Sequence, residues 1–106
     1  MSELEETLAW QIKAIGLPEP YTQYKFCPTR DWLVDFAWPD RRVVLEVEGG
    51  IYKAKSGHRS YSGITRDIEK YNMATWLGWQ VYRVTPVMVK NGDALNLIEK
   101  VLTGAM

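Results

Sequence analysis

Three carboxylates in a predicted β-hairpin constrain this chain more than any other feature. Residues 31–50 read DWLVDFAWPDRRVVLEVEGG, two apolar runs joined by a turn. Because side chains alternate along a strand, Asp35 of the first strand and both Glu46 and Glu48 of the second are predicted to lie on one face. The turn places Asp35 about opposite Glu46, where like charges repel. A fold retains such a cluster only when a cation offsets its negative charge, and a hard divalent metal ion is the usual cation.

The length and composition indicate one folded domain. The 106 residues are 46% hydrophobic and 25% charged, and we assign residues 1–106 to a single domain. No apolar run approaches the ~20 residues that span a membrane. The acidic start of the chain argues against a signal peptide, so we expect a cytoplasmic protein. Its single cysteine, Cys27, excludes an internal disulfide and any cysteine-based zinc site.

The net charge is zero, but charged residues are unevenly distributed. Residues 1–20 carry one basic and four acidic side chains, whereas residues 41–83 carry eight basic and four acidic ones. The second segment could therefore face a polyanion although the whole chain is neutral.

Hydrophobic periodicity predicts the order α-β-β-β-α-β-α, an α/β fold of the α+β kind. The predicted elements are a helix at 3–15, strands at 21–27, 31–37 and 42–48, a helix at 64–77, a strand at 79–85, a helical turn from Pro86, and a last helix from Gly92 or Asp93. Ser2 and Glu5 form a capping-box pattern at the first helix. The residues predicted to face inward on the three main helices are Leu4, Leu8, Ile12 and Ile15; Ile64, Ile68, Tyr71 and Ala74; and Ala94, Leu95, Ile98, Val101 and Leu102.

The segment between the hairpin and the second helix is rich in basic and aromatic residues. Residues 49–63 interleave them with glycine and serine, a composition suited to phosphate contacts and base stacking as well as to a solvated surface loop. Arg66 and Lys70 follow one helical turn apart and share a face. The candidate nucleic-acid contacts are Lys53, Lys55, His58, Arg59, Tyr61, Arg66 and Lys70.

The hairpin carboxylates suit a magnesium site. Mg²⁺ prefers oxygen ligands and keeps several waters, so two or three carboxylates on a rigid sheet are enough. The candidate ligands are Asp35, Glu46, the carbonyl of Val47 and Glu48, with Glu48 alternatively orienting a water molecule. A bound metal ion would allow phosphodiester hydrolysis. A solvated polar face of an antiparallel hairpin is the competing interpretation.

With these residues in this order, the chain resembles the PD-(D/E)XK nuclease superfamily. That family has metal-binding acids on the second and third strands, which here match Asp35, ten intervening residues and Glu46-Val47-Glu48. Residues 65–85, TRDIEKYNMATWLGWQVYRVT, resemble small nucleases related to the very-short-patch repair endonucleases. The resemblance extends over residues 4–102. It implies a restriction-endonuclease-like core with a mixed central sheet flanked by helices.

The resemblance also implies an activity. Similarity to small Holliday junction resolvases implies a Mg²⁺-dependent endodeoxyribonuclease, with Mn²⁺ as an alternative, from a phage or a bacterial cytoplasm. Its partner would be four-way or branched DNA, and the chain would be a homodimer because resolution needs two symmetric cuts. The helix acid of those resolvases matches Glu5, with Leu8, Ile12 and Gly16 at the spacing that follows it.

One departure from the family pattern bears on the chemistry. The third-strand motif usually ends in lysine, and here the residue is Glu48. Lys70, Lys53 or Lys55 could fill the space of that lysine, which places Lys70 among the catalytic candidates with Glu5, Asp35, Glu46 and Glu48.

Three alternatives remain open. The first is a metal-free ribonuclease that uses His58, Tyr61 and Lys70. The second is a non-catalytic DNA-binding subunit that kept the fold, which the Glu48 departure favours. The third is a nicking or mismatch-repair endonuclease with the same site and another substrate.

Overall fold

The computed structural model describes residues 1–48 and 61–104, with only the backbone of residues 61 and 62. Its elements follow the predicted order: α1 (Glu3–Ala14), β1 (Tyr21–Lys25), β2 (Leu33–Trp38), the short 3₁₀ helix η1 (Pro39–Arg41), β3 (Val43–Val47), α3 (Tyr61–Trp76), β4 (Gln80–Val84), α4 (Pro86–Asn91) and α5 (Asp93–Thr103). No helix within these residues is both long and apolar enough to cross a membrane.

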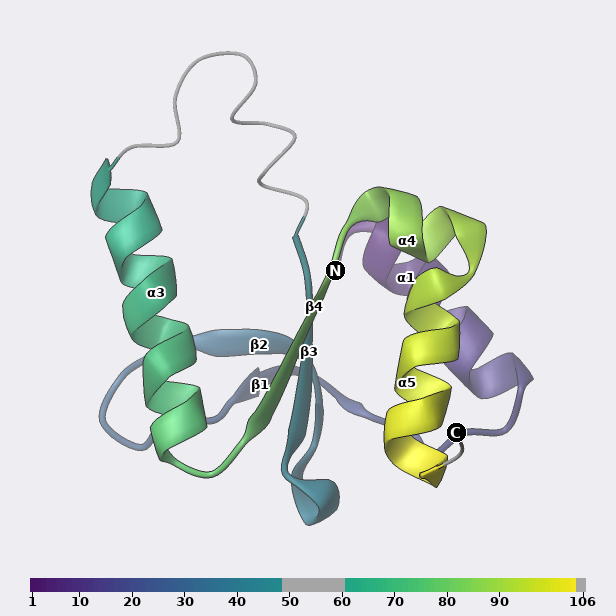
Figure 1. The fold of residues 1–106 in the computed structure, drawn as a ribbon, viewed down its shortest axis with the longest axis horizontal. Coiled ribbons are helices and arrows are strands. Elements are labelled where there is room, and N and C mark those ends of the chain that lie inside the picture. Colours follow the sequence, from purple (N-terminus) through teal and green to yellow (C-terminus); the bar gives the residue numbers. More distant parts are fainter. Residues whose placement is uncertain (49–60, 105–106) are drawn as a thin grey trace.

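The four strands form one mixed sheet in the order β1-β2-β3-β4. Strands β1 and β2 pair antiparallel, as do β2 and β3, whereas β3 and β4 pair parallel. The parallel pair requires a crossover connection, and α3 provides its helix. Helix α3 lies on one face of the sheet, and α1, α4 and α5 lie on the other (Figure 1). The predicted mixed sheet flanked by helices is confirmed.

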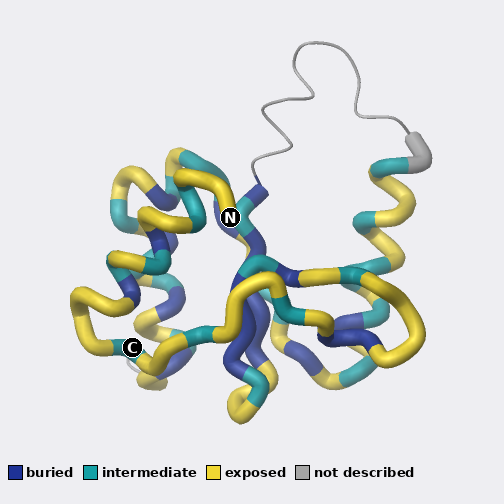
Figure 2. Tube along the Cα trace, turned by 180° about the vertical axis from the view of Figure 1, so that it is seen from behind, coloured by how far each residue is buried: buried dark blue, intermediate teal, exposed yellow. Residues whose placement is uncertain are grey.

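The two faces of the sheet build two separate cores. The larger core joins β2, β3 and β4 to α1, α4 and α5, and the smaller one packs the other face against α3. The larger contains Leu8, Ile12, Phe36, Trp38, Val43, Leu45, Val84, Val89, Ala94, Ile98 and Leu102; the smaller contains Phe26, Cys27, Val34, Ala37, Val44, Ala74 and Trp79. The buried positions concentrate in the centre of the sheet (Figure 2). The carboxylate-bearing strands β2 and β3 are therefore held between two packed layers.

Capping groups fix the helix ends, two of them local in sequence and one distant. Ser2 and Glu5 form the predicted capping box at the start of α1. Gly78 follows α3 with a φ of +92°, a conformation that glycine adopts without the steric cost of a side chain. The Arg42 guanidinium donates to the Leu77 carbonyl over 2.6 Å, which places a cation at the carboxyl end of α3.

Three predicted inward-facing residues are instead exposed. Ile15 is 46% exposed because α1 ends at Ala14 and the chain turns away there. Ile64 and Ile68 are 42% and 55% exposed. They lie in the first half of α3, which extends past the sheet, whereas Ala74 in the second half is buried (Figure 1). The predictions for α5 are correct, since Ala94, Ile98 and Leu102 are buried and Leu95 and Val101 pack against them.

Candidate active site

The site begins where the ladder between β2 and β3 gives way to side-chain hydrogen bonds. The backbone register runs from Trp38–Val43 to Phe36–Leu45. Beyond it, the Asp35 N–H donates to Glu46 Oε1 over 2.6 Å, and the Val47 N–H donates to Asp35 Oδ2 over 2.8 Å. Each carboxylate thus accepts from the backbone of the opposite strand. These bonds fix both carboxylates on a rigid sheet, as the pattern predicts.

Helix α3 brings a cation and a hydroxyl group to Glu46. Lys70 Nζ lies 3.1 Å from Glu46 Oε2, and both side chains are largely buried, with 14% and 10% exposed. The Tyr71 hydroxyl lies 3.2 Å from the same oxygen. The lysine offsets part of the negative charge that the two carboxylates concentrate here.

Glu48 is close to this pair but belongs to a second set of contacts. Its side chain is 9% exposed, and its Oε1 accepts from the Tyr71 hydroxyl over 2.8 Å and from Arg83 Nε over 2.9 Å. The Arg83 guanidinium carbon also lies 4.5 Å from the centroid of the Tyr71 ring. Tyr71 therefore bridges Glu46 and Glu48, while Arg83 contacts Glu48.

Burial and like charge shift the protonation of this cluster. Burial raises the pKa of Asp35 to about 7, and the Glu46 carboxylate adds to the shift. Burial, with the charge of Glu46 and the hydrogen bond to Glu48, also raises the pKa of Tyr71, so its hydroxyl remains a donor. The hydrogen bond to Glu48 raises the pKa of Arg83 as well. Without a further cation, Asp35 is thus not fully ionised near neutral pH.

Glu5 lies at the margin of the site. Its carboxylate caps α1 and also accepts from Gln23 Nε2 of β1 over 2.9 Å. Gln23 falls between residues that pair with Val34 and Phe36, so it lies opposite Asp35. The charge of Glu5 contributes to the raised pKa of Asp35. The capping role and a place near the site therefore coexist in one residue.

The remaining predicted residues are distributed as follows. Arg66 is exposed on α3, and Val47 shows its N–H bonded to Asp35; a ligand role for its carbonyl stays a prediction. The side chain of Tyr61 and the whole of Lys53, Lys55, His58 and Arg59 lie outside the described residues.

Sequence reasoning missed two residues of the cluster. The sequence predicts Tyr71 only as an inward-facing helix residue and Arg83 only as a member of the basic segment 41–83. No local sequence signal indicates either contact, because Tyr71 depends on how α3 crosses the sheet and Arg83 on its parallel register with Glu46.

The donor set fits a hard divalent cation through two carboxylates. In the described part of the chain, no three His, Cys, Asp or Glu side chains converge as a complete metal-ligand cluster. Asp35 and Glu46 nevertheless offer oxygen donors held by the backbone, and Mg²⁺ usually takes one or two carboxylates with several waters. Burial and, after it, the charge of Glu46 raise the pKa of Asp35, and a bound cation would stabilise the ionised form against both.

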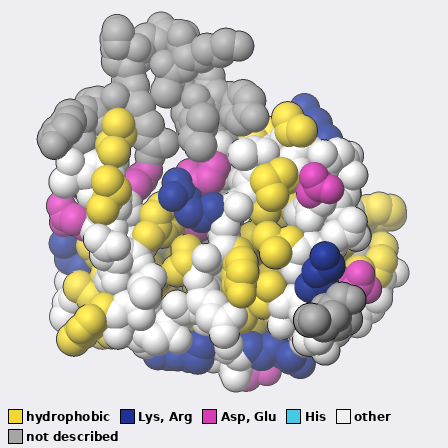
Figure 3. Space-filling view, in the orientation of Figure 1, with side chains coloured by type: hydrophobic (Ala, Val, Ile, Leu, Met, Phe, Trp, Pro, Cys, Tyr) yellow, Lys and Arg dark blue, Asp and Glu magenta, His cyan; other side chains and the backbone are white. Residues whose placement is uncertain are grey.

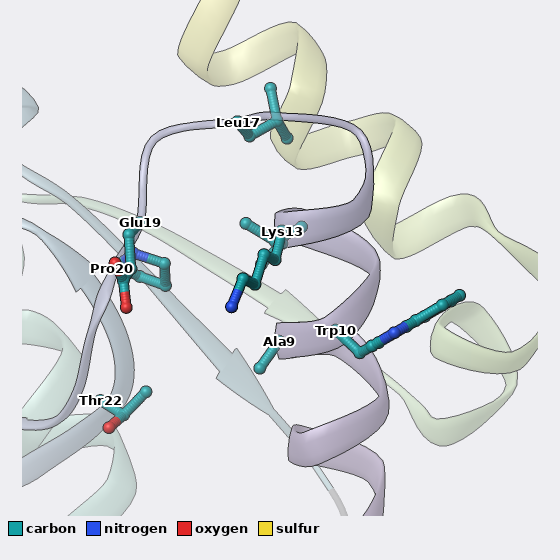
Figure 4. A pocket seen from close by; sticks show the side chains of 8 residues that line it. Ala9, Trp10, Lys13, Leu17, Glu19, Pro20 and Thr22 are labelled. Atoms are coloured by element: carbon teal, nitrogen blue, oxygen red, sulfur yellow. The ribbon is translucent and has the colours of Figure 1, made fainter.

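A hollow on the other side of the sheet does not compete as the catalytic site. It has a volume of about 380 Å³ and lies between α1 and the segment leading into β1. Its walls include Ile12, Lys13, Leu17, Glu19 and Thr22. Lys13 extends toward the Glu19–Pro20 side of this space, whereas Trp10 points away from it (Figure 4). Glu19 is the one acid on its described walls, so it lacks the paired carboxylates of the β2–β3 site.

The fold is similar to that of a known nuclease domain. No family model and no curated protein sequence matches the chain. A solved structure, the catalytic domain of the homing endonuclease I-Bth0305I, superposes with a TM-score of 0.67 at 14% sequence identity. The match covers 95% of this chain and 94% of that domain. The chain therefore has the fold of an endonuclease catalytic domain.

Proposed function

We propose that this chain is a metal-dependent DNA endonuclease. The observation that carries the proposal is the Asp35–Glu46 pair, fixed by the backbone of β2 and β3 with Lys70 3.1 Å from Glu46. A metal ion held by carboxylates can polarise a phosphodiester and activate water, and a lysine beside them can stabilise developing negative charge. The fold, which is similar to that of an endonuclease catalytic domain, also supports the proposal.

Asp35 and Glu46 would hold the metal ion, with Mg²⁺ first and Mn²⁺ second among the candidates. Both present oxygen donors, which hard cations prefer. When bound, such an ion would polarise the phosphodiester and lower the pKa of a water molecule bound to it. The protein itself holds both carboxylates in one orientation, through hydrogen bonds from the backbone N–H groups of Asp35 and Val47.

Lys70 is proposed to do the work of the lysine that the third strand lacks. Its ammonium group reaches Glu46 from α3, on the same face of the sheet as the carboxylates. There it can stabilise negative charge that develops on a phosphate oxygen during hydrolysis. Because its side chain is only 14% exposed, water screens this charge less than it screens a surface lysine.

The sequence resemblance to Holliday junction resolvases suggests branched DNA as the substrate. On that basis the substrate is a four-way junction, and the enzyme is a cytoplasmic homodimer that cuts two strands symmetrically. Lys53, Lys55, His58, Arg59, Tyr61 and Arg66 are the proposed DNA contacts. The basic balance of residues 41–83 supports contact with a polyanion.

The test is cleavage of labelled DNA of three shapes. A four-way junction, a linear duplex and a single strand are incubated with Mg²⁺, Mn²⁺ or EDTA and with wild type or Glu46→Gln. Paired, metal-dependent cuts in the junction that vanish in the variant are expected. Binding without cleavage in either metal would leave a DNA-binding module, and activity on RNA that survives EDTA would indicate the metal-free ribonuclease instead.

A second candidate keeps the chemistry and changes the substrate. The structural neighbour is the catalytic domain of a homing endonuclease. Its likeness supports an endonuclease without indicating a junction, and the second candidate is an enzyme that cuts or nicks linear duplex DNA. Metal-dependent cleavage of the duplex alone, absent in Glu46→Gln, would select this candidate over the junction-resolving one.

A further inference from the structure

Arg83 is held more firmly than its exposure suggests. It pairs with Glu46 in the parallel register of β3 and β4, which puts both side chains on one face of the sheet. Its Nε donates to Glu48 over 2.9 Å, and its guanidinium carbon lies 4.5 Å from the Tyr71 ring centroid. A carboxylate and an aromatic face thus restrain the guanidinium from two directions.

Arg83 and Tyr71, which both contact Glu48, line an open hollow between α3 and β4. The Arg83 side chain is 46% exposed, and the hollow measures about 270 Å³. Ile64, Ile68 and Tyr71 form apolar walls, and Asp67 is the one acid lining it among the described residues. Basic and acidic side chains meet in this recess between α3 and the sheet (Figure 3).

The hydrogen bond from Arg83 to Glu48 leaves the two terminal nitrogens of the guanidinium as donors for a ligand. A guanidinium carries five N–H donors, and the bond to Glu48 uses the one on Nε. The two terminal nitrogens of such a group match the geometry of a phosphate, and pre-organised donors lose little entropy on binding. A phosphate next to the Asp35–Glu46 pair is what a DNA strand in this site would present.

We propose that Arg83 binds a phosphate of the DNA substrate and that Glu48 and Tyr71 position its guanidinium, so that Glu48 does not bind the metal ion. The inference rests on the proposed nuclease function. The proposal also explains why Glu48 stands where the PD-(D/E)XK pattern has lysine. Glu48 binds Arg83 of β4, so a cation is still held at this position. Two cations then serve the site, Lys70 at Glu46 and Arg83 at Glu48.

The first test measures metal affinity without DNA. Isothermal titration with Mn²⁺ compares wild type, Glu46→Gln and Glu48→Gln. We expect Glu46→Gln to lose at least about 10-fold in affinity and Glu48→Gln to stay within about twofold of wild type. Equal losses in the two variants would show that Glu48 is a metal ligand and would overturn the positioning role.

The second test measures phosphate contact by salt dependence. Anisotropy of labelled junction and duplex DNA is followed in EDTA between about 50 and 200 mM KCl. Arg83→Gln should flatten the slope of log affinity against log salt by about 0.9, the value for one lost phosphate contact. Arg83→Lys should keep the slope and bind more weakly, since a point charge does not replace the fork. An unchanged slope in Arg83→Gln would overturn the proposal.

The chain offers a matched control in Arg30. This arginine also stacks on an aromatic ring, 4.0 Å from the Trp32 centroid, and lies 4.0 Å from Glu69. Arg30→Gln removes the same charge and similar contacts away from the carboxylates, so metal affinity and salt slope should stay at wild-type values. Circular dichroism of each variant checks the fold.

A double-mutant comparison separates positioning from direct binding. Glu48→Gln with Arg83→Gln should bind DNA no more weakly than Arg83→Gln alone, because Glu48 acts through Arg83. Losses of DNA affinity that add up in the double variant would show that Glu48 does not act through Arg83. If wild type binds no DNA, the proposed function falls as well; if wild type cleaves DNA while Arg83→Gln keeps the wild-type slope, only this inference falls.

Discussion

The backbone N–H of Asp35 donates a hydrogen bond of 2.6 Å to the Glu46 carboxylate, so the two acids are held together by the sheet itself. The Val47 N–H returns a bond to Asp35. Side-chain oxygens therefore continue the hydrogen bonding of the β2–β3 pair past its backbone register. Two like charges are thereby kept close at a cost that a bound cation would offset.

Glu46→Gln is expected to abolish most cleavage while leaving the fold intact. The amide keeps the size of the side chain and an oxygen that can accept from Asp35, but it loses the charge that pairs with Lys70. We expect a fall in kcat of at least about 100-fold. Single-turnover cleavage assays measure the fall, and unchanged circular dichroism would exclude unfolding as its cause. Wild-type rates in this variant would remove Glu46 from the site.

Without metal, the stability of the protein should fall as pH rises toward neutrality. The pKa of Asp35 is about 7 in the fold, against about 3.9 in an unfolded chain. Between these values the folded state binds more protons, so the free energy of unfolding decreases with increasing pH. The contribution of Asp35 is fully present below about pH 4 and is lost as the pH passes about 7. Urea unfolding in EDTA at several pH values measures this trend, and Asp35→Asn should flatten it.

Metal binding should reverse that loss. A cation at Asp35 and Glu46 requires both carboxylates ionised, so its affinity should rise with pH and its binding should release a proton. At 100 times the dissociation constant, Mg²⁺ or Mn²⁺ should add about 2.7 kcal/mol to the free energy of unfolding. Thermal unfolding at pH 8 with and without metal measures the gain. Glu46→Gln should show little of it, and an equal gain in this variant would place the ion elsewhere.

The sequence predicted the carboxylate face of the site because that face depends on local geometry. Strand alternation and a tight turn determine that Asp35 and Glu46 meet, and the structure brings them together. The same reasoning failed for Ile64 and Ile68, because helical periodicity does not say where along α3 the sheet ends.

The contacts of Tyr71 and Arg83 depend on long-range packing. Tyr71 reaches Glu46 and Glu48 only because α3 crosses over the sheet at that residue. Arg83 reaches Glu48 only because β4 pairs parallel to β3 in a register that no local pattern specifies. The roles predicted for residues 53–59 fall outside the described residues and stay predictions.

Trp38→Phe should destabilise the fold without changing the site. Trp38 is 1% exposed in the core between β2 and the helical layer, and its indole N–H donates to the Pro18 carbonyl over 2.8 Å. Phenylalanine removes that donor, and because Pro18 is exposed water can bond its carbonyl, so the lost hydrogen bond costs about 0.5–1.5 kcal/mol before the lost volume is counted. Urea unfolding measures the loss. Metal affinity in the folded variant should equal that of wild type, since Trp38 packs against α1, α4 and α5, on the face of the sheet opposite α3 and Lys70.

Tyr71→Phe should slow cleavage more than it weakens metal binding. The hydroxyl lies within hydrogen-bond distance of both Glu46 and Glu48, and its raised pKa keeps it protonated at any working pH. The phenyl ring preserves the surface against which Arg83 packs, so the fold and the stacking contact should remain. Without the hydroxyl, Glu46 retains Lys70 and the Asp35 N–H, whereas Glu48 retains Arg83. We expect kcat to fall about 10-fold with Mn²⁺ affinity nearly unchanged, as for the loss of a group that orients others. Cleavage rates and Mn²⁺ titration on the same sample separate the two effects. A loss of metal affinity alone would contradict this prediction and would show that Tyr71 orients Glu46 for metal binding only.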